Sequence, residues 1–231
     1  MEKLQEIPSV FDTENSITFP DIDEYTYWEA RESRIFYVDW EIDEEYFALE
    51  LSKVIIQMNF KEMSIPKEQL KPIYIFIHSY GGDLEQAYGL IDVLLSSRIP
   101  IITITMGAAM SAGCLIFLAG HKRYSFEHSN LMIHKGNGQI SGTADQIEQA
   151  QKNYKKNLDN MKEFVLSRTN LSEKIFNRNK NKDWYFTSEE LIEYGIVDKI
   201  INDFEDIFKT ESDSQYSKVA ESASDQLLMP C

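Results

Sequence analysis

The sequence predicts an α/β protein with a parallel β-sheet core, because two strand–turn–helix units follow one another directly. In the first unit, a continuous apolar stretch at residues 72–78 leads through a glycine pair into a helical pattern at residues 84–95. In the second unit, β-branched residues 101–105 precede a small-residue turn around Ser111 and an apolar helical segment. A strand that is apolar on both faces is typical of a parallel sheet. Consecutive units of this kind join by right-handed crossovers.

Three segments precede the first unit. Residues 1 to about 30 are acidic and irregular and predict a partly ordered N-terminal arm, with a docking surface as the alternative. Residues 34–38 have the apolar and aromatic composition of a strand. From Asp43 onward we expect a helix of about five turns, because apolar residues recur at helical spacing. These residues are Phe47, Leu51, Val54, Ile55 and Met58.

The segment after the second unit predicts a loop and a short strand over residues 121–134, and then the longest helix. A glycine-rich stretch, residues 136–142, precedes this helix, and Thr143 with Gln146 forms a capping box at its start. The helix continues to about residue 168, roughly 39 Å, with one apolar stripe. The stripe consists of Ile147, Ala150, Tyr154, Leu158, Met161 and Val165. We expect a partner subunit to pack on it; the alternative is a helix that lies across its own sheet.

The C-terminal part contains a basic, asparagine-rich turn at residues 177–182 and a second capping box, Thr187 with Glu190, that begins a short helix. Residues 196–201 predict a closing strand. The remaining residues are polar and predict a flexible acidic tail. The predicted organisation is an N-terminal arm, one domain and a tail, at residues 1–30, 31–208 and 209–231.

Composition and charge exclude several classes of function. The chain has 231 residues and a formal net charge of −15, and such acidity opposes binding to nucleic acid or to anionic membranes. Its apolar runs are shorter than the roughly 20 residues of a membrane span, and no signal-peptide core is expected at the N-terminus. Two cysteines, Cys114 and Cys231, do not form a disulfide framework. We therefore expect a cytoplasmic protein that binds no nucleic acid and no membrane.

Ser111 is the leading candidate for a reactive side chain. Small residues on both sides let the backbone approach closely, and the serine falls at or near the first turn of a helix. Free N–H groups and the positive end of the helix dipole favour a developing negative charge there. From this segment alone, a tightly packed core helix with an incidental serine is the alternative.

A serine nucleophile also needs a histidine base within hydrogen-bond reach, and the chain has four histidines. His121 and His128 lie in a polar connection, where surface positions are expected. His78 adjoins the glycine pair and is the rival of His134. The residues alone leave the choice between these two open.

Four stretches of the chain carry a resemblance to a known family. They are IYIFIHSYGG (73–82), TMGAAMSAGCLIFLAG (105–120), LMIHKGNGQISGTADQIE (131–148) and DWYFTSEELIEYGIVDKI (183–200). In this order they resemble the Clp protease proteolytic subunit (ClpP) family, over roughly residues 30–202. The resemblance implies a ClpP/crotonase-like fold with a parallel β-sheet core and a long protruding handle helix.

The resemblance also implies a serine endopeptidase that acts through an acyl-enzyme, with a distinct role for each site residue. These are Ser111 as nucleophile, His134 as general base, Asp183 as the residue that orients the base, Gly82 and Ala112 as backbone oxyanion donors, and Gly136 and Gly138 in the substrate-binding strand. No metal and no cofactor are expected.

The sequence departs from the family pattern beside several of these residues. Tyr80 stands in place of the proline of the family, and His78 in place of an asparagine. Lys135 stands where Gln-Pro is common. Trp184 replaces an arginine that, in the family, forms an ion pair between two stacked rings of subunits. We expect the indole of Trp184 to be buried at the same contact.

The implied assembly is a homo-oligomer, a heptameric ring that stacks into a double ring through residues 136–142 and 143–168. The chain has no nucleotide-binding motif, so unfolding of the polypeptide substrates is assigned to a separate AAA+ ATPase. The alternatives are a phage-type prohead or maturation protease, a non-catalytic ring subunit, and a crotonase-like acyl-CoA enzyme. Ser111 and His134 together disfavour the last, since that chemistry needs no such serine.

Overall fold

The structure is a computed structural model that describes residues 22–39, 41–42, 45–136 and 140–208. Most of the predicted N-terminal arm and the whole predicted tail lie outside these ranges. The part of the arm that is described, together with the residues after it, forms the helix α1 (Ile22–Ser33). The irregular composition of the arm did not predict this helix.

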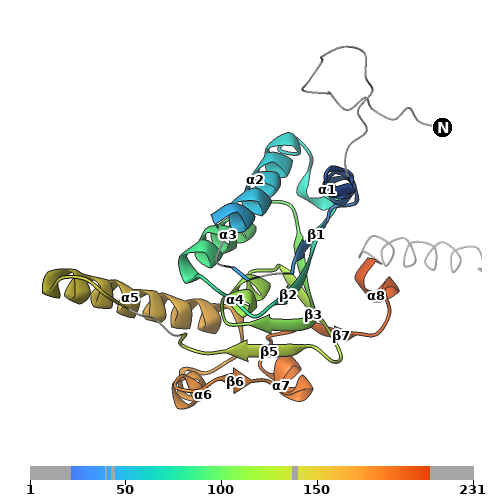
Figure 1. Cartoon of the computed structure of the whole chain (residues 1–231). Coiled ribbons are helices and arrows are strands. Elements are labelled where there is room, and N and C mark those ends of the chain that lie inside the picture. The colour runs from blue at the N-terminus through green and yellow to red at the C-terminus, as the bar shows by residue number, and fades with distance from the viewer. Residues whose placement is uncertain (1–21, 40, 43–44, 137–139, 209–231) are drawn as a thin grey trace, which may run out of the picture.

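A parallel β-sheet forms the centre of the molecule (Figure 1). The strands in order across the sheet are β1 (Ile35–Val38), β2 (Ile73–Ser79), β3 (Ile101–Met110), β4 (Lys122–Phe126) and β7 (Lys199–Ile201). Each strand runs parallel to its neighbour on this path. The last part of β3 pairs with β5 (Asn130–Ile133), which in turn pairs antiparallel with β6 (Trp184–Tyr185). The predicted parallel α/β core is therefore confirmed.

Helices cover the two faces of the sheet unequally (Figure 1). One face is covered by α2 (Glu45–Lys61), α3 (Leu84–Ser96) and α4 (Ala112–Leu118). The short helix α8 (Glu205–Phe208) lies against the other face. The remaining elements are η1 (Lys67–Gln69), α5 (Ala144–Arg168), α6 (Glu173–Asn179) and α7 (Ser188–Glu193). Among the described residues, none of the helices is both long and apolar enough to cross a membrane.

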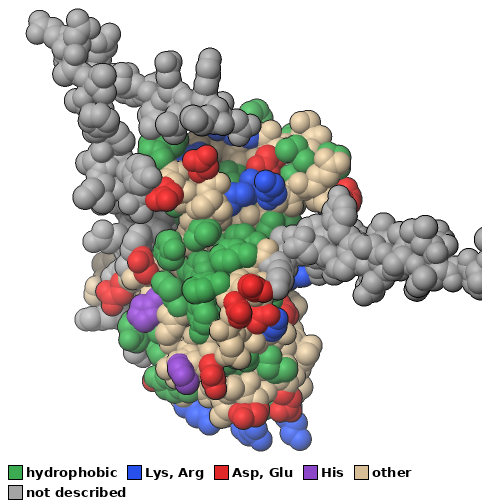
Figure 2. Space-filling model, turned by 90° about the vertical axis from the view of Figure 1, so that its right-hand side faces the viewer, with side chains coloured by type: hydrophobic (Ala, Val, Ile, Leu, Met, Phe, Trp, Pro, Cys, Tyr) green, Lys and Arg blue, Asp and Glu red, His purple; other side chains and the backbone are tan. Residues whose placement is uncertain are grey.

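The strand β2 shows how the two faces are packed. Ile73, Ile75 and Ile77 are fully buried in the core shared with α2, α3 and α4, and full burial of one such side chain contributes about 1.5–3 kcal/mol. Tyr74 and Phe76 alternate with them and belong to a second apolar cluster on the opposite face. Figure 2 shows hydrophobic side chains gathered on this second face. The prediction of a strand buried on both faces is confirmed.

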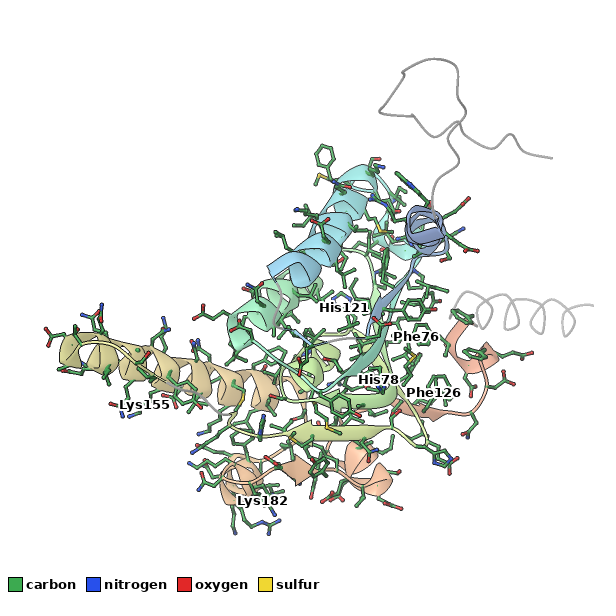
Figure 3. The ribbon with its side chains drawn as sticks, viewed as in Figure 1. Phe76, His78, His121, Phe126, Lys155 and Lys182 are labelled. Atoms are coloured by element: carbon green, nitrogen blue, oxygen red, sulfur yellow. The ribbon has the colours of Figure 1, made fainter. Side chains whose placement is uncertain are left out.

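The helix α5 begins with the predicted capping box, since Thr143 N–H donates to Gln146 Oε1 (2.9 Å) and Gln146 N–H donates to Thr143 Oγ1 (3.4 Å). Within the described residues, the apolar stripe is buried at Met161 and Val165, near the end of the helix, and half-buried at Tyr154 and Leu158. Ile147 remains 40% exposed. The first half of α5 projects from the body, as the position of Lys155 in Figure 3 also shows. This half of the helix does not lie across its own sheet.

Three expectations about local structure were wrong. Residues 122–126 form the strand β4 instead of a loop, because pairing with β3 and β7 stabilises a sequence that has no apolar run. The first residues of the predicted basic turn, 177–179, belong to the end of α6 (Glu173–Asn179), and Ser172 caps the start of this helix. The closing strand is limited to Lys199–Ile201, although Ile196 and Val197 before it are buried.

Cys114 is buried in the core on α4, and burial raises the pKa of its thiol to about 12 from the ordinary value of 9.0. The folded state therefore disfavours the thiolate. The stability that this group contributes is present below about pH 9 and is lost as the pH rises toward about 12.

We expect Cys114 to resist alkylation in the folded protein, because iodoacetamide reacts with the exposed thiolate. In a Cys231→Ser variant, intact mass after treatment near pH 8 should show no adduct, and one adduct should appear in denaturant. Labelling of the native protein at the rate of a free thiol would contradict the buried position.

Candidate active site

The strand β3 changes its partner halfway along its length, and this change brings the candidate site together. Ile102 to Thr105 pair with β4, whereas Ala108 to Met110 pair with β5. On the other side, the register with β2 shifts between the pairs Ile77–Thr105 and Ser79–Ala109. This irregularity is a bulge, and bulges re-aim the residues that follow them. The carboxyl ends of β3 and β5 consequently lie side by side.

Ser111 follows β3 directly and occupies the N-cap position of α4. Its backbone has φ 52° and ψ −124°, a left-handed conformation that costs a non-glycine residue about 1–3 kcal/mol. The Ser111 N–H donates to the Met132 carbonyl on β5 (2.9 Å), and its own carbonyl accepts from Cys114 N–H (3.0 Å). These bonds hold a sharp strand-to-helix turn with Ser111 at its apex.

The Ser111 hydroxyl lies against His134, the residue after β5. His134 Nε2 is 2.8 Å from Ser111 Oγ, and His134 Nδ1 is 3.1 Å from Asp183 Oδ1. Because a carboxylate only accepts hydrogen bonds, it favours the tautomer with the proton on Nδ1. Nε2 is then free to accept the hydroxyl proton. The three side chains form the continuous chain of hydrogen bonds that nucleophilic catalysis by serine uses.

Strand register explains why Asp183 meets His134 from a position 49 residues away. In the antiparallel pair of β5 and β6, Met132 lies opposite Tyr185 and Ile133 opposite Trp184. The next pair in this register is His134 with Asp183. The histidine side chain is largely buried, whereas the aspartate is 61% exposed. Solvent therefore screens the charge of Asp183, and its hydrogen bond orients the imidazole.

A tight loop after β2 lies against the Ser111 turn. Gly81 has φ +110°, and a Cβ placed on it would be 2.7 Å from Ser111 Cβ. Gly82 forms a parallel bridge with Ile42, in which Ile42 N–H donates to the Gly81 carbonyl (2.8 Å) and Asp83 N–H donates to the Ile42 carbonyl. This pattern directs the Gly82 N–H away from Ile42. The Ala112 N–H belongs to the first turn of α4, where helical N–H groups have no intrahelical acceptor.

The other three histidines do not reach Ser111. His78 places Nδ1 2.7 Å from the Met106 carbonyl. His121 is exposed but accepts a hydrogen bond from the Ile101 N–H at Nδ1 (2.9 Å), and its pKa is lowered by partial desolvation of the imidazole and by Arg168. His128 is exposed in the turn after β4. The structure therefore pairs Ser111 with His134 and not with the rival His78.

The predicted substrate strand is described only at its ends. Gly136 has φ +76°, and its carbonyl and that of Lys135 both lie 3.3 Å from the Tyr154 hydroxyl on α5. Gly138 lies outside the described residues. The contact with Tyr154 ties the start of this segment to the helix that follows it.

The expectation for Trp184 was wrong. Its side chain is only 7% exposed within a single chain and packs on Phe186, with ring centroids 4.5 Å apart, and on Tyr194. An indole that is already buried inside its own subunit has no surface left for a contact between two stacked rings of subunits. The exposed neighbour on β6 is Tyr185, at 54%.

Two residues that shape the site escaped the sequence analysis. Ile42 anchors the Gly81–Gly82 loop and Met132 anchors the Ser111 turn, both through backbone atoms. Backbone contacts leave no signal in the side-chain sequence, so no pattern could have identified them. Across the described ranges, no three His, Cys, Asp or Glu side chains come together as a metal site.

Comparisons with known proteins agree on one family. The sequence profile of the Clp protease family matches residues 25–204. ATP-dependent Clp protease proteolytic subunit 2 of Treponema denticola is 31% identical over 160 residues, which are 68% of this chain and 79% of that protein. Subunit 1 of Bacillus cereus is 30% identical over 170 residues, 73% of this chain and 84% of that protein. The structure of a ClpP1 point mutant from Listeria monocytogenes superposes with a TM-score of 0.65 at 26% identity, covering 77% of this chain and 96% of that one.

Proposed function

Because the chain belongs to the Clp protease family of serine peptidases, we propose that it cleaves unfolded polypeptides through an acyl-enzyme on Ser111. The observation that carries this proposal is the chain of hydrogen bonds from Ser111 through His134 to Asp183. A non-catalytic subunit has no need to hold Ser111 in a strained conformation beside a histidine of the right tautomer.

In the proposed reaction, Ser111 Oγ attacks the carbonyl carbon of the scissile peptide bond while His134 Nε2 takes the hydroxyl proton. The imidazolium that forms is stabilised by Asp183 and then gives its proton to the leaving amine. The N–H groups of Gly82 and Ala112 donate to the oxyanion of the tetrahedral intermediate. Water activated by the same histidine hydrolyses the ester and restores Ser111.

We assign substrate binding to the segment that begins at Gly136 and includes Gly138. An extended peptide adds to such a segment by backbone hydrogen bonds, which suit substrates of varied sequence. The position of Gly136 two residues after His134 supports this role, because it brings bound backbone close to the proposed base.

Pre-steady-state hydrolysis of a chromogenic peptide ester tests the reaction. We expect a burst of one product per active site, followed by slower turnover, as the acyl-enzyme accumulates. A linear progress curve with no covalent species by mass spectrometry would contradict catalysis by an acyl-enzyme.

We further propose that the protein works as a heptameric ring, stacked into a double ring, and is fed by a separate AAA+ unfoldase. The relatives described above carry the names of subunits of an ATP-dependent protease, which supports both an assembly and an ATPase partner. The projecting half of α5, with Ile147 40% exposed, supports a surface that another copy covers.

Substituting Ile147 by aspartate is expected to weaken the assembly, because the charge must be desolvated when a neighbouring copy covers α5. Light scattering at micromolar concentration should show a shift from the ring toward species near the protomer mass of 26.9 kDa. The matched control is Gln149→Asp, which adds the same charge to an exposed position on the opposite side of α5. Equal effects of the two variants, or a wild-type protein at the protomer mass, would contradict the proposed interface.

A further inference from the structure

The bulge in β3 is held from one side by His78. This residue lies near the end of β2 (Figure 3). Its Nδ1 is 2.7 Å from the carbonyl of Met106, inside the bulge. A carbonyl only accepts hydrogen bonds, so Nδ1 carries a proton and donates it. The imidazole is half-buried, and the ring of Tyr80 meets it edge to face with centroids 5.9 Å apart.

The shape of the bulge matches this ring closely. Gly107, the residue after Met106, has φ +91°, and a Cβ placed there would lie 2.6 Å from His78 Nδ1. The imidazole therefore occupies the space that a side chain at position 107 would need. From the other side, Ser129 accepts a hydrogen bond from the Gly107 N–H and donates one to the Thr105 carbonyl, both at 3.1 Å.

The bulge is also the point from which Ser111 is aimed. Up to Thr105 the strand follows β4, and from Ala108 it follows β5, whose end carries His134. Only a few residues, paired with β5, separate the bulge from Ser111. A displacement at Met106 and Gly107 is therefore passed along paired backbone to the distance between Ser111 Oγ and His134 Nε2. Misplacement by about 1 Å at a reacting group costs about 100-fold in rate.

We propose that His78 is a positioning residue for acylation: its Nδ1–H bond to the Met106 carbonyl fixes the β3 bulge and so sets Ser111 against His134. The inference rests on the proposed function of Ser111 as nucleophile. His78 then has a role in catalysis although it is not the base. The property of His78 that matters is the hydrogen-bond donor at Nδ1.

A pair of nearly isosteric variants tests the role of that donor. In His78→Asn the amide nitrogen reaches the position of Nδ1 and keeps the bond to Met106, whereas His78→Leu has similar size and no donor. The readouts are the rate of covalent labelling of Ser111 by a fluorophosphonate, and the rate constant of acylation in the burst phase with its dependence on the concentration of a peptide ester. Thermal unfolding and light scattering establish that both variants fold and assemble.

His78→Leu is expected to label with the fluorophosphonate, and to acylate in the burst phase, about 10- to 100-fold more slowly. The dissociation constant of the substrate, taken from the concentration dependence of the burst, should be unchanged, because alignment at the reacting atoms is lost and ground-state binding is not. His78→Asn is expected to restore most of the wild-type rate. Ser129→Ala, which releases the bulge from its other side, should likewise slow acylation in the burst phase with substrate binding unchanged. If His78→Leu does not fold, acylation at the wild-type rate in Ser129→Ala contradicts the control of Ser111 by the bulge.

Folded His78→Leu that labels at the wild-type rate overturns the inference. An equally slow His78→Asn also overturns it, since the donor is then not the cause. A third contradicting result is weaker substrate binding with an unchanged rate constant of acylation in the burst phase. Absence of labelling in the wild-type protein contradicts the proposed function itself, and the inference then falls with it.

Discussion

Replacing Ser111 with alanine is expected to abolish hydrolysis of peptide esters while the fold and the assembly persist. Loss of a serine nucleophile typically lowers kcat by several powers of ten. Alanine keeps the backbone bonds from Ser111 to Met132 and Cys114, since these use no side-chain atoms. It also has the same strain as serine at φ 52°, so the stability of the turn should change little.

The comparison for this variant is Ser167→Ala, which removes an exposed hydroxyl on α5 that donates to the Phe164 carbonyl of the same helix. Both proteins should unfold near the wild-type temperature, and only the Ser111 variant should lose activity. Retention of most of the activity by Ser111→Ala would show that the nucleophile is another residue.

Replacing Gly82 with alanine is expected to lower kcat by about 100- to 1,000-fold, the loss typical when one oxyanion donor is removed. A Cβ at this position would lie 2.5 Å from the carbonyl carbon and oxygen of Ile42. These atoms are backbone and cannot rotate aside, and φ +143° is itself unfavourable for alanine. The loop must therefore shift, and the Gly82 N–H moves away from the reacting carbonyl.

Gly89→Ala is the matched control, because a Cβ at Gly89 meets no described atom within 4 Å outside the backbone of its own helix. This glycine lies inside α3, where alanine is favoured by about 0.5–1 kcal/mol. The control should unfold at a slightly higher temperature and keep wild-type kcat. Wild-type kcat in folded Gly82→Ala would exclude this N–H group as an oxyanion donor.

Local signals predicted much of the fold. The unbroken apolar run of β2 and the helical spacing of apolar residues in α2 and α3 predicted the parallel core. A strand that is buried on both faces has a distinct, continuously apolar sequence. Both capping boxes, at Thr143 and Thr187, are present as predicted, since each needs only two residues within one helical turn. The start of α4 at Ser111 was likewise readable from one short segment.

Features that depend on pairing between distant strands could not be predicted in the same way. The strand β4 has no apolar run and is fixed by its neighbours β3 and β7. The meeting of His134 and Asp183 depends on the register of β5 with β6, which no local pattern specifies. The residue types alone do not distinguish His78 from His134 as the base for Ser111. The structure distinguishes them, because His78 directs its imidazole to the Met106 carbonyl in the β3 bulge.

The buried ring of Trp184 illustrates a different limit. A tryptophan in place of a charged residue fits either an interface or a core, and the sequence does not distinguish them. In the structure, Trp184 packs on Phe186 and Tyr194 and therefore belongs to the core. The stripe on α5, by contrast, agrees with the expectation of a partner, because Ile147 near its start is 40% exposed in the single chain.

The most direct test of the proposed catalytic role of Ser111 is intact-mass analysis of the wild-type protein after treatment with a fluorophosphonate probe, followed by peptide mapping. We expect one adduct per chain, located on Ser111, and no adduct in Ser111→Ala or after unfolding. An unmodified wild-type protein that is folded and assembled, or an adduct on a different residue, would contradict it.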